Sequence, residues 1–254
     1  NRLDLLKNCI ESILENTLYP NYKILVYSNG CTDGTQEYLQ ETENKHNNIV
    51  PILSEKNDAF VIPNNEMMQM FPENDVVLLN NDVTVTPGWL TGLHNAIYSS
   101  KDFGIAGGKV LFSSGKLQEF GGEQYAQGYG RKFGCNDDPN KEIYNHLRTT
   151  GYVSSCMMYI KRSTLDKVGV FDELFHPCYS EDADLCYTAW AQGIQTIVTP
   201  GCTIRRNKGG AADVDINTYY KAHQKPNYRK FLKKHWGKKN TINWDIPKPE
   251  WMTK

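Results

Sequence analysis

The chain of 254 residues is 39% hydrophobic and carries a formal net charge of −1 at pH 7, so it is long enough to bury a core of its own. No run of about eighteen apolar residues is present, which excludes a membrane-spanning helix, and no signal peptide stands at its start. The seven cysteines are scattered without a Cys-x-x-Cys pair. We therefore expect free thiols in a reducing compartment rather than a disulfide framework or a zinc site.

The net charge hides an asymmetry between the two ends of the chain. Residues 201–254 hold thirteen Lys or Arg against four Asp or Glu, a net charge of +9, which leaves −10 on residues 1–200. A basic helix is often only a solvated surface, but it also attracts anionic lipid or a phosphate-bearing substrate. Both interpretations stay open. The second makes contact with the inner face of the membrane a hypothesis for an otherwise cytoplasmic protein.

Strands and helices alternate through the first hundred residues. Apolar residues at helical spacing predict a helix over 4–16, and runs of apolar and β-branched residues predict the strands Tyr22–Tyr27 and Ile49–Leu53. A helix is expected at Asn64–Phe71 and another at Gly88–Ser99. This alternation is typical of a mainly parallel, doubly wound sheet flanked by helices.

Polar residues mark the starts of two of these helices. The turn Ser28–Thr35 offers Thr32 or Asp33 as the N-cap of the helix that follows it. Thr86 is the expected N-cap of the later helix, with Pro87 at its first position. Turns such as Ser28–Thr35 present backbone N–H groups to an anion, although one such turn is weak evidence for a binding site.

The run Val76–Leu79 contains only aliphatic residues and is followed by Asn80, Asn81 and Asp82. Four consecutive aliphatic residues without alternation predict a central parallel strand that is buried on both faces. In open α/β sheets, ligands lie beyond the carboxyl ends of the strands, and a carboxylate there holds a hard divalent cation that neutralises phosphate. The alternative is that Asp82 is an ordinary turn residue.

The second half of the chain does not continue this regular alternation of strands and helices. Strands are expected at Ile105–Phe112, Tyr152–Ile160 and Ile194–Val198, and a basic helix at about Asn217–Trp236. Between the first two strands, Gly121–Gly134 is rich in glycine and aromatic residues without any period. We expect this segment to be a mobile loop that folds over a ligand.

Three acidic residues, Glu181, Asp182 and Asp184, begin another expected helix. The helix dipole favours acids in a first turn, which explains their presence but not their crowding. Residues one and two apart do not share a helix face, so Asp182 points in a different direction if Glu181 and Asp184 face solvent.

Four motifs, in this order, resemble those of the inverting family 2 glycosyltransferases of the GT-A fold, in particular the bacterial rhamnosyltransferase-like branch. They are Ser28–Thr35, Leu78–Thr84, Gly169–Glu173 and Ser180–Cys186. The resemblance implies an α/β, Rossmann-like GT-A domain with a mainly parallel central sheet over residues 1–204. Its donor half would be about 1–100 and its acceptor half about 101–204, with a basic helical extension over 205–254. The family's first strand would be missing ahead of residue 1.

The resemblance also implies a donor site. Asp82 matches the acid that binds Mg²⁺ or Mn²⁺ bridging the donor diphosphate, and Asn29, Asn57 and Asn81 match residues of the donor pocket. Many relatives place a metal-binding histidine after the last strand, near Arg205 and Arg206 in this sequence. Arginine does not ligate a cation but clamps phosphate oxygens. We therefore expect this pair to hold the diphosphate, in part replacing metal.

The same resemblance makes Asp182 the general base that takes the proton of an acceptor hydroxyl. Glu181 beside it is a candidate acceptor-binding residue, and so is Ser155, whose small side chain leaves room for a ligand. His176 either contacts the acceptor or is an ordinary loop histidine.

The sequence thus predicts an enzyme of polysaccharide or cell-wall biosynthesis. It would transfer a sugar, with inversion, from a UDP- or dTDP-sugar to a glycan or lipid-linked glycan, and would have no nucleic-acid partner. The alternative is a non-catalytic nucleotide-sugar or glycan binding module of the same fold. A nucleotidyltransferase would normally carry a Gly-rich basic loop after its first strand, and none is visible.

Overall fold

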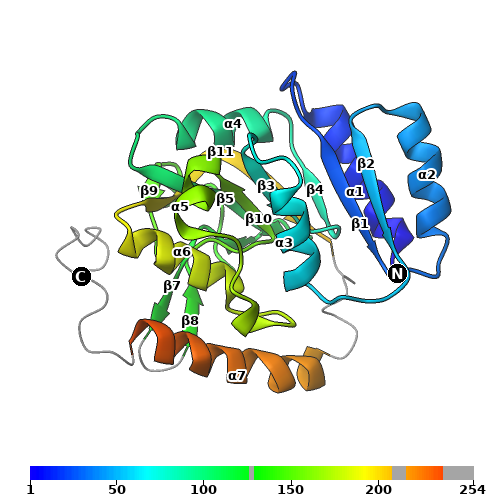
Figure 1. The fold of residues 1–254 in the computed structure, drawn as a ribbon. Helices are drawn as coiled ribbons and strands as arrows, with labels where there is room; N and C mark the ends of the chain where they lie inside the picture. Colours follow the sequence, from blue (N-terminus) through cyan, green and yellow to red (C-terminus); the bar gives the residue numbers. More distant parts are fainter. Residues whose placement is uncertain (126–128, 208–215, 237–254) are drawn as a thin grey trace.

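The computed structural model describes residues 1–125, 129–207 and 216–236 (Figure 1). Two main sheets lie side by side with helices packed around them, and the pair β7–β8 forms a third, two-stranded sheet, so the expected α/β layering is confirmed. The elements of the first hundred residues are α1 (Leu3–Asn16), β1 (Ile24–Asn29), α2 (Thr35–Lys45), β2 (Ile49–Ser54), α3 (Val61–Gln69), β3 (Val76–Leu79), β4 (Val83–Val85) and α4 (Trp89–Ile97).

The second half contributes longer strands, short turns and the last helices. These elements are β5 (Phe103–Phe112), β6 (Leu117–Glu119), β7 (Gly122–Tyr125), β8 (Tyr129–Lys132), the 3₁₀ turn η1 (Glu142–Tyr144), β9 (Arg148–Thr149), β10 (Met157–Ile160), α5 (Arg162–Val168), the 3₁₀ turn η2 (Glu173–Phe175), α6 (Glu181–Ala191), β11 (Gln195–Arg206) and α7 (Ile216–His235).

The smaller sheet consists of β1 and β2, which run parallel and in register from Ile24 opposite Ile49. Its core is formed by α1 and α2, whose buried Leu6, Ile10 and Leu39 pack against Val26 and Ile49. The helix expected at 4–16 is therefore confirmed: part of its apolar stripe covers this sheet, and Cys9 and Ile13 pack in the core of the larger sheet.

The larger sheet has the strand order β3-β10-β5-β11-β4, with β6 and β9 paired to β5 and β11. The pairing β5–β11 is parallel, whereas β3–β10, β10–β5 and β11–β4 are antiparallel. The expectation that Val76–Leu79 is a central parallel strand is wrong: β3 is the outermost strand of this order and pairs antiparallel with β10. Four aliphatic residues indicate cover on both faces, but they do not specify which strands lie beside them.

The two expected caps are also different in the structure. α2 begins after Gly34, whose φ is +83°, and Asp33 instead accepts hydrogen bonds from the backbone N–H groups of Arg2 and Leu3 at the start of α1. α4 begins after Gly88, and the Thr86 hydroxyl donates to the carbonyl of Thr203. In both places a side chain that resembles a local cap forms a tertiary contact.

The segment Gly121–Gly134, expected to be a mobile loop, contains the antiparallel pair β7–β8. Gly122 is needed here because a Cβ atom at this residue would lie 2.5 Å from the Tyr152 ring. The strand expected over Tyr152–Ile160 is reduced to β10, and the residues before it form a turn. In the described residues of this segment, glycine and aromatic residues therefore mark close packing, and residues 126–128 lie outside the described residues.

The basic helix expected at about Asn217–Trp236 is confirmed as α7, which runs along the β7, β8 and α6 side of the molecule (Figure 1). Phe231 of α7 is fully buried in the same core as Phe175 and Tyr187. The boundary expected at residue 204 falls inside β11, and residues 208–215 and 237–254 of the expected extension lie outside the described residues. Within the described part of the chain, no helix is both long enough and apolar enough to cross a bilayer.

Candidate functional site

A cavity of about 3050 Å³ lies between the two sheets. Residues of β1 line one side and residues of β3 line the other, and in the described chain neither strand pairs with another along the edge that faces the cavity. The cavity extends past both ends of β3, from Asp75 to Asp82. It exceeds the roughly 300–1,000 Å³ of an ordinary ligand pocket.

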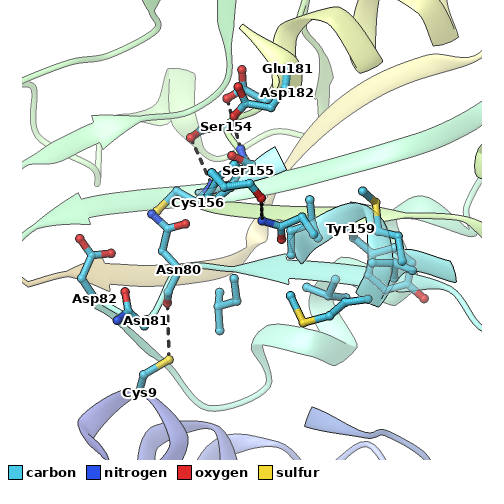
Figure 2. Close-up of a pocket in the computed structure, with 18 of the residues that line it drawn as sticks. Cys9, Asn80, Asn81, Asp82, Ser154, Ser155, Cys156, Tyr159, Glu181 and Asp182 are labelled. Carbon is cyan, nitrogen blue, oxygen red and sulfur yellow. Dashed lines mark hydrogen bonds between the residues drawn. The ribbon is translucent and has the colours of Figure 1, made fainter. Parts of the chain in front are cut away.

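Asp82 lies in the turn between β3 and β4, at the wall of this cavity (Figure 2). Its side chain is buried, and its Oδ2 accepts a hydrogen bond of 2.9 Å from Nε of Arg206 on β11. Its backbone carbonyl accepts from the N–H of Asn207 at 2.7 Å. The other carboxylate oxygen, Oδ1, is buried without a hydrogen-bond partner, so Asp82 has one lone acceptor available for a ligand.

Asp182 occupies the first turn of α6 and lines the same cavity, opposite the turn that carries Asp82 (Figure 2). Its Oδ1 accepts from the N–H of Ala183 at 2.7 Å, and its Oδ2 accepts from the N–H of Ser155 at 3.3 Å. Burial raises the pKa of Asp182 to about 6, against the lowering effect of these two bonds. A carboxylate with this pKa is poised to accept a proton near neutral pH.

Glu181 is buried beside Asp182, and its Oε2 has no hydrogen-bond partner. Burial, followed by the charge of Asp182, raises the pKa of Glu181 well above its ordinary value. This shift favours the neutral form of Glu181 beside the Asp182 carboxylate.

Two residues that sequence reasoning missed act electrostatically on Asp182. Glu119 of β6 is buried and forms an ion pair with Lys132 of β8, which lines the cavity. The charge of Glu119 raises the pKa of Asp182, and the charge of Lys132 lowers it. The local sequence offers no signal for Glu119, because acidic side chains are rarely buried unless they are paired, and its partner Lys132 lies thirteen residues later in the chain.

The three asparagines expected in the donor pocket all line the cavity. The amide of Asn29 is already bonded to backbone atoms of Asp58 and Ala59, and Oδ1 of Asn57 accepts from the N–H of Ala59. Asn81 is exposed. Asn29 and Asn57 therefore shape the loop after β2, whereas Asn81 presents an exposed side chain at the cavity.

The two arginines do not form a pair at the cavity. Arg206 lines it and bonds Asp82, whereas Arg205 is exposed and is not among the lining residues. Successive residues of a strand point to opposite faces, and β11 extends through both positions. Of the two arginines expected to hold the diphosphate, only Arg206 lies at the cavity, where it forms an ion pair with Asp82.

The expected acceptor residues are divided in the same way. Ser155 is buried at the cavity wall, one hydrogen bond from Asp182. His176 is exposed and lies outside the residues that line the cavity. The structure therefore brings Glu181, Asp182 and Ser155 together and leaves His176 out.

The described residues contain no group of three or more His, Cys, Asp or Glu side chains placed to hold a metal ion. The free Oδ1 of Asp82 still provides one oxygen ligand. Mg²⁺ is commonly held by one or two carboxylates together with substrate phosphates and water, so this site fits a cation that arrives with a diphosphate.

Comparison with protein families assigns the domain. Residues 1–221 match the family described as "Glycosyltransferase like family 2". The chain belongs to this family. The predicted kinship is confirmed over most of the sequence, and the turn of Asp82 and the helix start of Asp182 both lie inside the matched residues.

Two curated relatives of this family 2 domain are much longer proteins. One is the O-antigen biosynthesis protein RfbC of Myxococcus xanthus, 28% identical over 205 residues, which are 78% of this chain and 16% of that protein. Another is the uncharacterized protein y4gI of Sinorhizobium fredii, 26% identical over 204 residues, again 78% of this chain and 22% of that protein. The chain thus spans about a fifth of the length of either relative.

The fold of this family 2 domain is similar to that of GalNAc-T7 in a crystal structure with UDP, GalNAc and Mn²⁺. The TM-score is 0.71, with 12% sequence identity, and the match covers 92% of this chain and 46% of that one. This likeness confirms the predicted GT-A fold.

Proposed function

We propose that this family 2 domain is an inverting glycosyltransferase that moves a sugar from a nucleoside-diphosphate donor to a hydroxyl of a glycan or lipid-linked glycan. The observation that carries the proposal is that Asp182, with its raised pKa, and Asp82, with its free Oδ1, line one cavity from opposite sides. Asp182 is the general base of the reaction.

The reaction needs two charged groups on different sides of the sugar. The acceptor oxygen attacks the anomeric carbon as its proton passes to Asp182, and the bond from that carbon to the diphosphate oxygen breaks with its electron pair. The leaving diphosphate gains negative charge, which Arg206 at the opposite wall helps to neutralise. Glu181 and Ser155 beside the base hold the acceptor.

Mg²⁺ or Mn²⁺ would be held by Oδ1 of Asp82 together with the donor diphosphate, where it would add positive charge near the leaving group. Asn81 would contact the donor, and Asn29 and Asn57 would support the donor loop from behind. UDP- and dTDP-sugars, and a peripheral position at a membrane, stay predictions for this chain.

The test is a panel of nucleotide sugars assayed with wild type and with Asp182→Asn, which keeps the shape but removes the base. We expect kcat to fall by about 10²–10⁴-fold while the affinity for the donor stays within about twofold. The matched control is Asp166→Asn, at a residue of α5 outside the cavity lining, which should leave kcat unchanged.

The same panel separates the enzyme from a binding module. A module would bind donor without any turnover in wild type, and Asp182→Asn would then change nothing measurable. Turnover that persists in Asp182→Asn would overturn the role of this residue.

A further inference from the structure

The turn that leads into Asp182 has an unusual backbone. Tyr179 and Ser180, the last two residues before α6, have φ angles of +76° and +73°. Residues other than glycine rarely adopt this left-handed conformation, and it persists only where the surrounding structure fixes it. Ser180 makes no side-chain capping bond to α6, so its own hydroxyl does not hold this turn.

One contact that fixes this turn comes from α7. Asn227 of α7 is 2% exposed, and its amide nitrogen donates to the carbonyls of Phe175 at 2.6 Å and Cys178 at 2.8 Å. Its amide oxygen accepts from Nζ of Lys230, which also donates to the carbonyl of Leu174. A single side chain therefore bonds the backbone at both ends of the segment 175–178.

A second contact comes from the opposite side of the same segment. The carbonyl of Pro177 accepts from the backbone N–H groups of Phe60 and Val61, at the start of α3. The segment before Asp182 is thus held between α3 and α7, which are far apart in the sequence.

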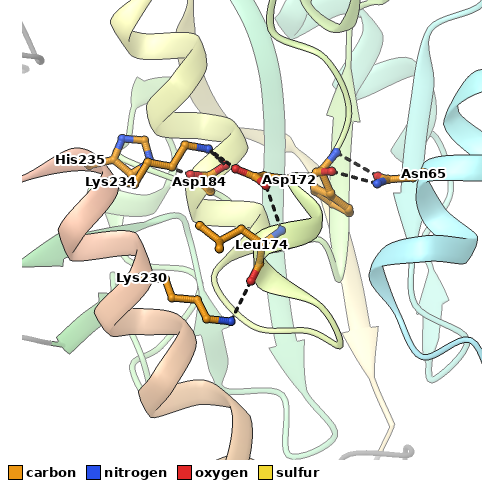
Figure 3. Close-up of polar contacts among 8 residues, drawn as sticks. Asn65, Asp172, Leu174, Asp184, Lys230, Lys234 and His235 are labelled. Atoms are coloured by element: carbon orange, nitrogen blue, oxygen red, sulfur yellow. Dashed lines mark hydrogen bonds and ion pairs between the residues drawn. The ribbon is translucent and has the colours of Figure 1, made fainter.

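α7 also holds the helix just after Asp182. Asp184 is 3% exposed and accepts from Lys234 at 2.8 Å and from His235 at 2.7 Å (Figure 3). Lys234 bonds Asp172 as well, at 2.8 Å. α7 therefore bonds the chain on both sides of Asp182, at Cys178 and at Asp184.

We propose that α7 is a splint for Asp182: it sets the position of this residue by bonding the chain on both sides of it. Asn227 is the positioning residue before Asp182. After Asp182, the anchor is Asp184, which His235 and Lys234 hold. This proposal rests on the role of Asp182 in the proposed function. It gives the basic helix a part in catalysis through the geometry of the base.

The test is Asn227→Ala, compared with Asn65→Ala as a matched control. Asn65 of α3 is also buried and also makes two backbone hydrogen bonds, to the N–H and the carbonyl of Phe171, but it does not bond the segment 175–178 (Figure 3). We expect Asn227→Ala to lower kcat by about tenfold to a hundredfold with the KM for donor nearly unchanged, since a misplaced base costs turnover rather than binding. Asn65→Ala should lose stability without that loss of kcat.

Hydrogen exchange gives a readout that does not depend on turnover. Amides of residues 178–184 should exchange faster in Asn227→Ala than in wild type, and no faster in Asn65→Ala. If the amides exchange faster in Asn227→Ala but the wild type transfers no sugar, the role of α7 in holding this turn is supported and the proposed function is overturned. Active wild type with equal kcat and equal exchange in the two variants would overturn the splint alone.

A second pair of variants covers the case in which Asn227→Ala does not fold. His235→Ala removes one bond to Asp184, and His235→Gln retains a donor at that place. We expect His235→Ala to lower kcat and His235→Gln to restore it, with the KM for donor unchanged in both. A loss of kcat that is the same in both variants would count against the anchor.

Discussion

The two acids of the cavity are held very differently. Around Asp182, backbone amides of Ser155 and Ala183 contact the carboxylate directly, and helices α3 and α7 bond the turn before it. Asp82 instead depends on one arginine from β11, and beyond it lie a large cavity and the open edges of β1 and β3.

The two carboxylates therefore differ in how many packed elements fix their positions. The proposed acceptor side, around Asp182, is preorganised, because its hydrogen-bonding groups come from several packed elements. The donor side presents a free carboxylate oxygen and an arginine whose charge is already matched. We therefore expect acceptor-side changes to act on turnover, and donor-side changes to act on ligand binding and stability.

The largest expected effect is that of pH on turnover. Because the base must be ionised and burial raises the pKa of Asp182 to about 6, kcat should fall about tenfold per pH unit below pH 6. Stability runs the other way: a raised folded pKa stabilises the fold fully below the unfolded value near 3.8 and no longer does so above about 6. A pH profile of kcat and a pH series of unfolding midpoints measure both trends.

Two substitutions should move this pH profile in opposite directions. Glu119→Gln removes a negative charge that raises the pKa of Asp182, so the midpoint of the acid limb should fall. Lys132→Met removes a positive charge, so that midpoint should rise. Shifts in the same direction would show that general disruption of the ion pair, not its charges, controls the base.

The next effect is that of Arg206→Ala on the donor side. It leaves the buried Asp82 carboxylate without its ion-pair partner, which we expect to cost about 2 kcal/mol of unfolding free energy, less than for a fully buried pair because Arg206 is partly exposed. Donor affinity should fall as well if Arg206 neutralises the diphosphate as proposed. Urea unfolding and donor titration measure the two losses, and unchanged affinity would remove Arg206 from the donor site.

A smaller effect is stabilisation by nucleotides. At ten times its dissociation constant, a bound ligand should raise the unfolding free energy by about 1.4 kcal/mol, and the melting temperature by a few degrees. A thermal-shift panel of UDP, dTDP and their sugars with Mn²⁺, repeated with excess chelator, measures this effect. A shift that is the same with chelator would indicate that Arg206 holds the diphosphate without a cation.

The smallest effect is expected for Arg205→Ala. Because Arg205 is exposed and outside the cavity lining, the variant should change stability by less than about 0.5 kcal/mol and leave donor affinity unaltered. Donor titrations of Arg205→Ala and Arg206→Ala, compared with each other, test whether strand alternation decides which of the two arginines binds the donor. Equal losses in the two variants would contradict this.

The local helices and strands and the order of the motifs could be predicted from the sequence. Apolar periodicity predicted α1, and the resemblance to family 2 glycosyltransferases implied that Asp82 and Asp182 belong to one site. Pairing was not predictable in the same way, because the aliphatic run of β3 is compatible with a central or an outer strand.

Other errors arose where contacts join distant residues. Thr86 and Asp33 resemble local caps but bond residues elsewhere in the chain. Ending the last strand at Val198 concealed the alternation that separates Arg205 from Arg206, since β11 continues to the latter. Glu119 was missed because its effect on the base acts through space.

The open edges of β1 and β3 have a consequence for handling the protein. Each leaves a row of backbone N–H and C=O groups without a strand partner in the described part of the chain, and such a row is a template for an extended segment of another molecule. At high concentration, the protein should therefore self-associate through these strand edges. A short peptide that binds as a strand between β1 and β3 should suppress that aggregation.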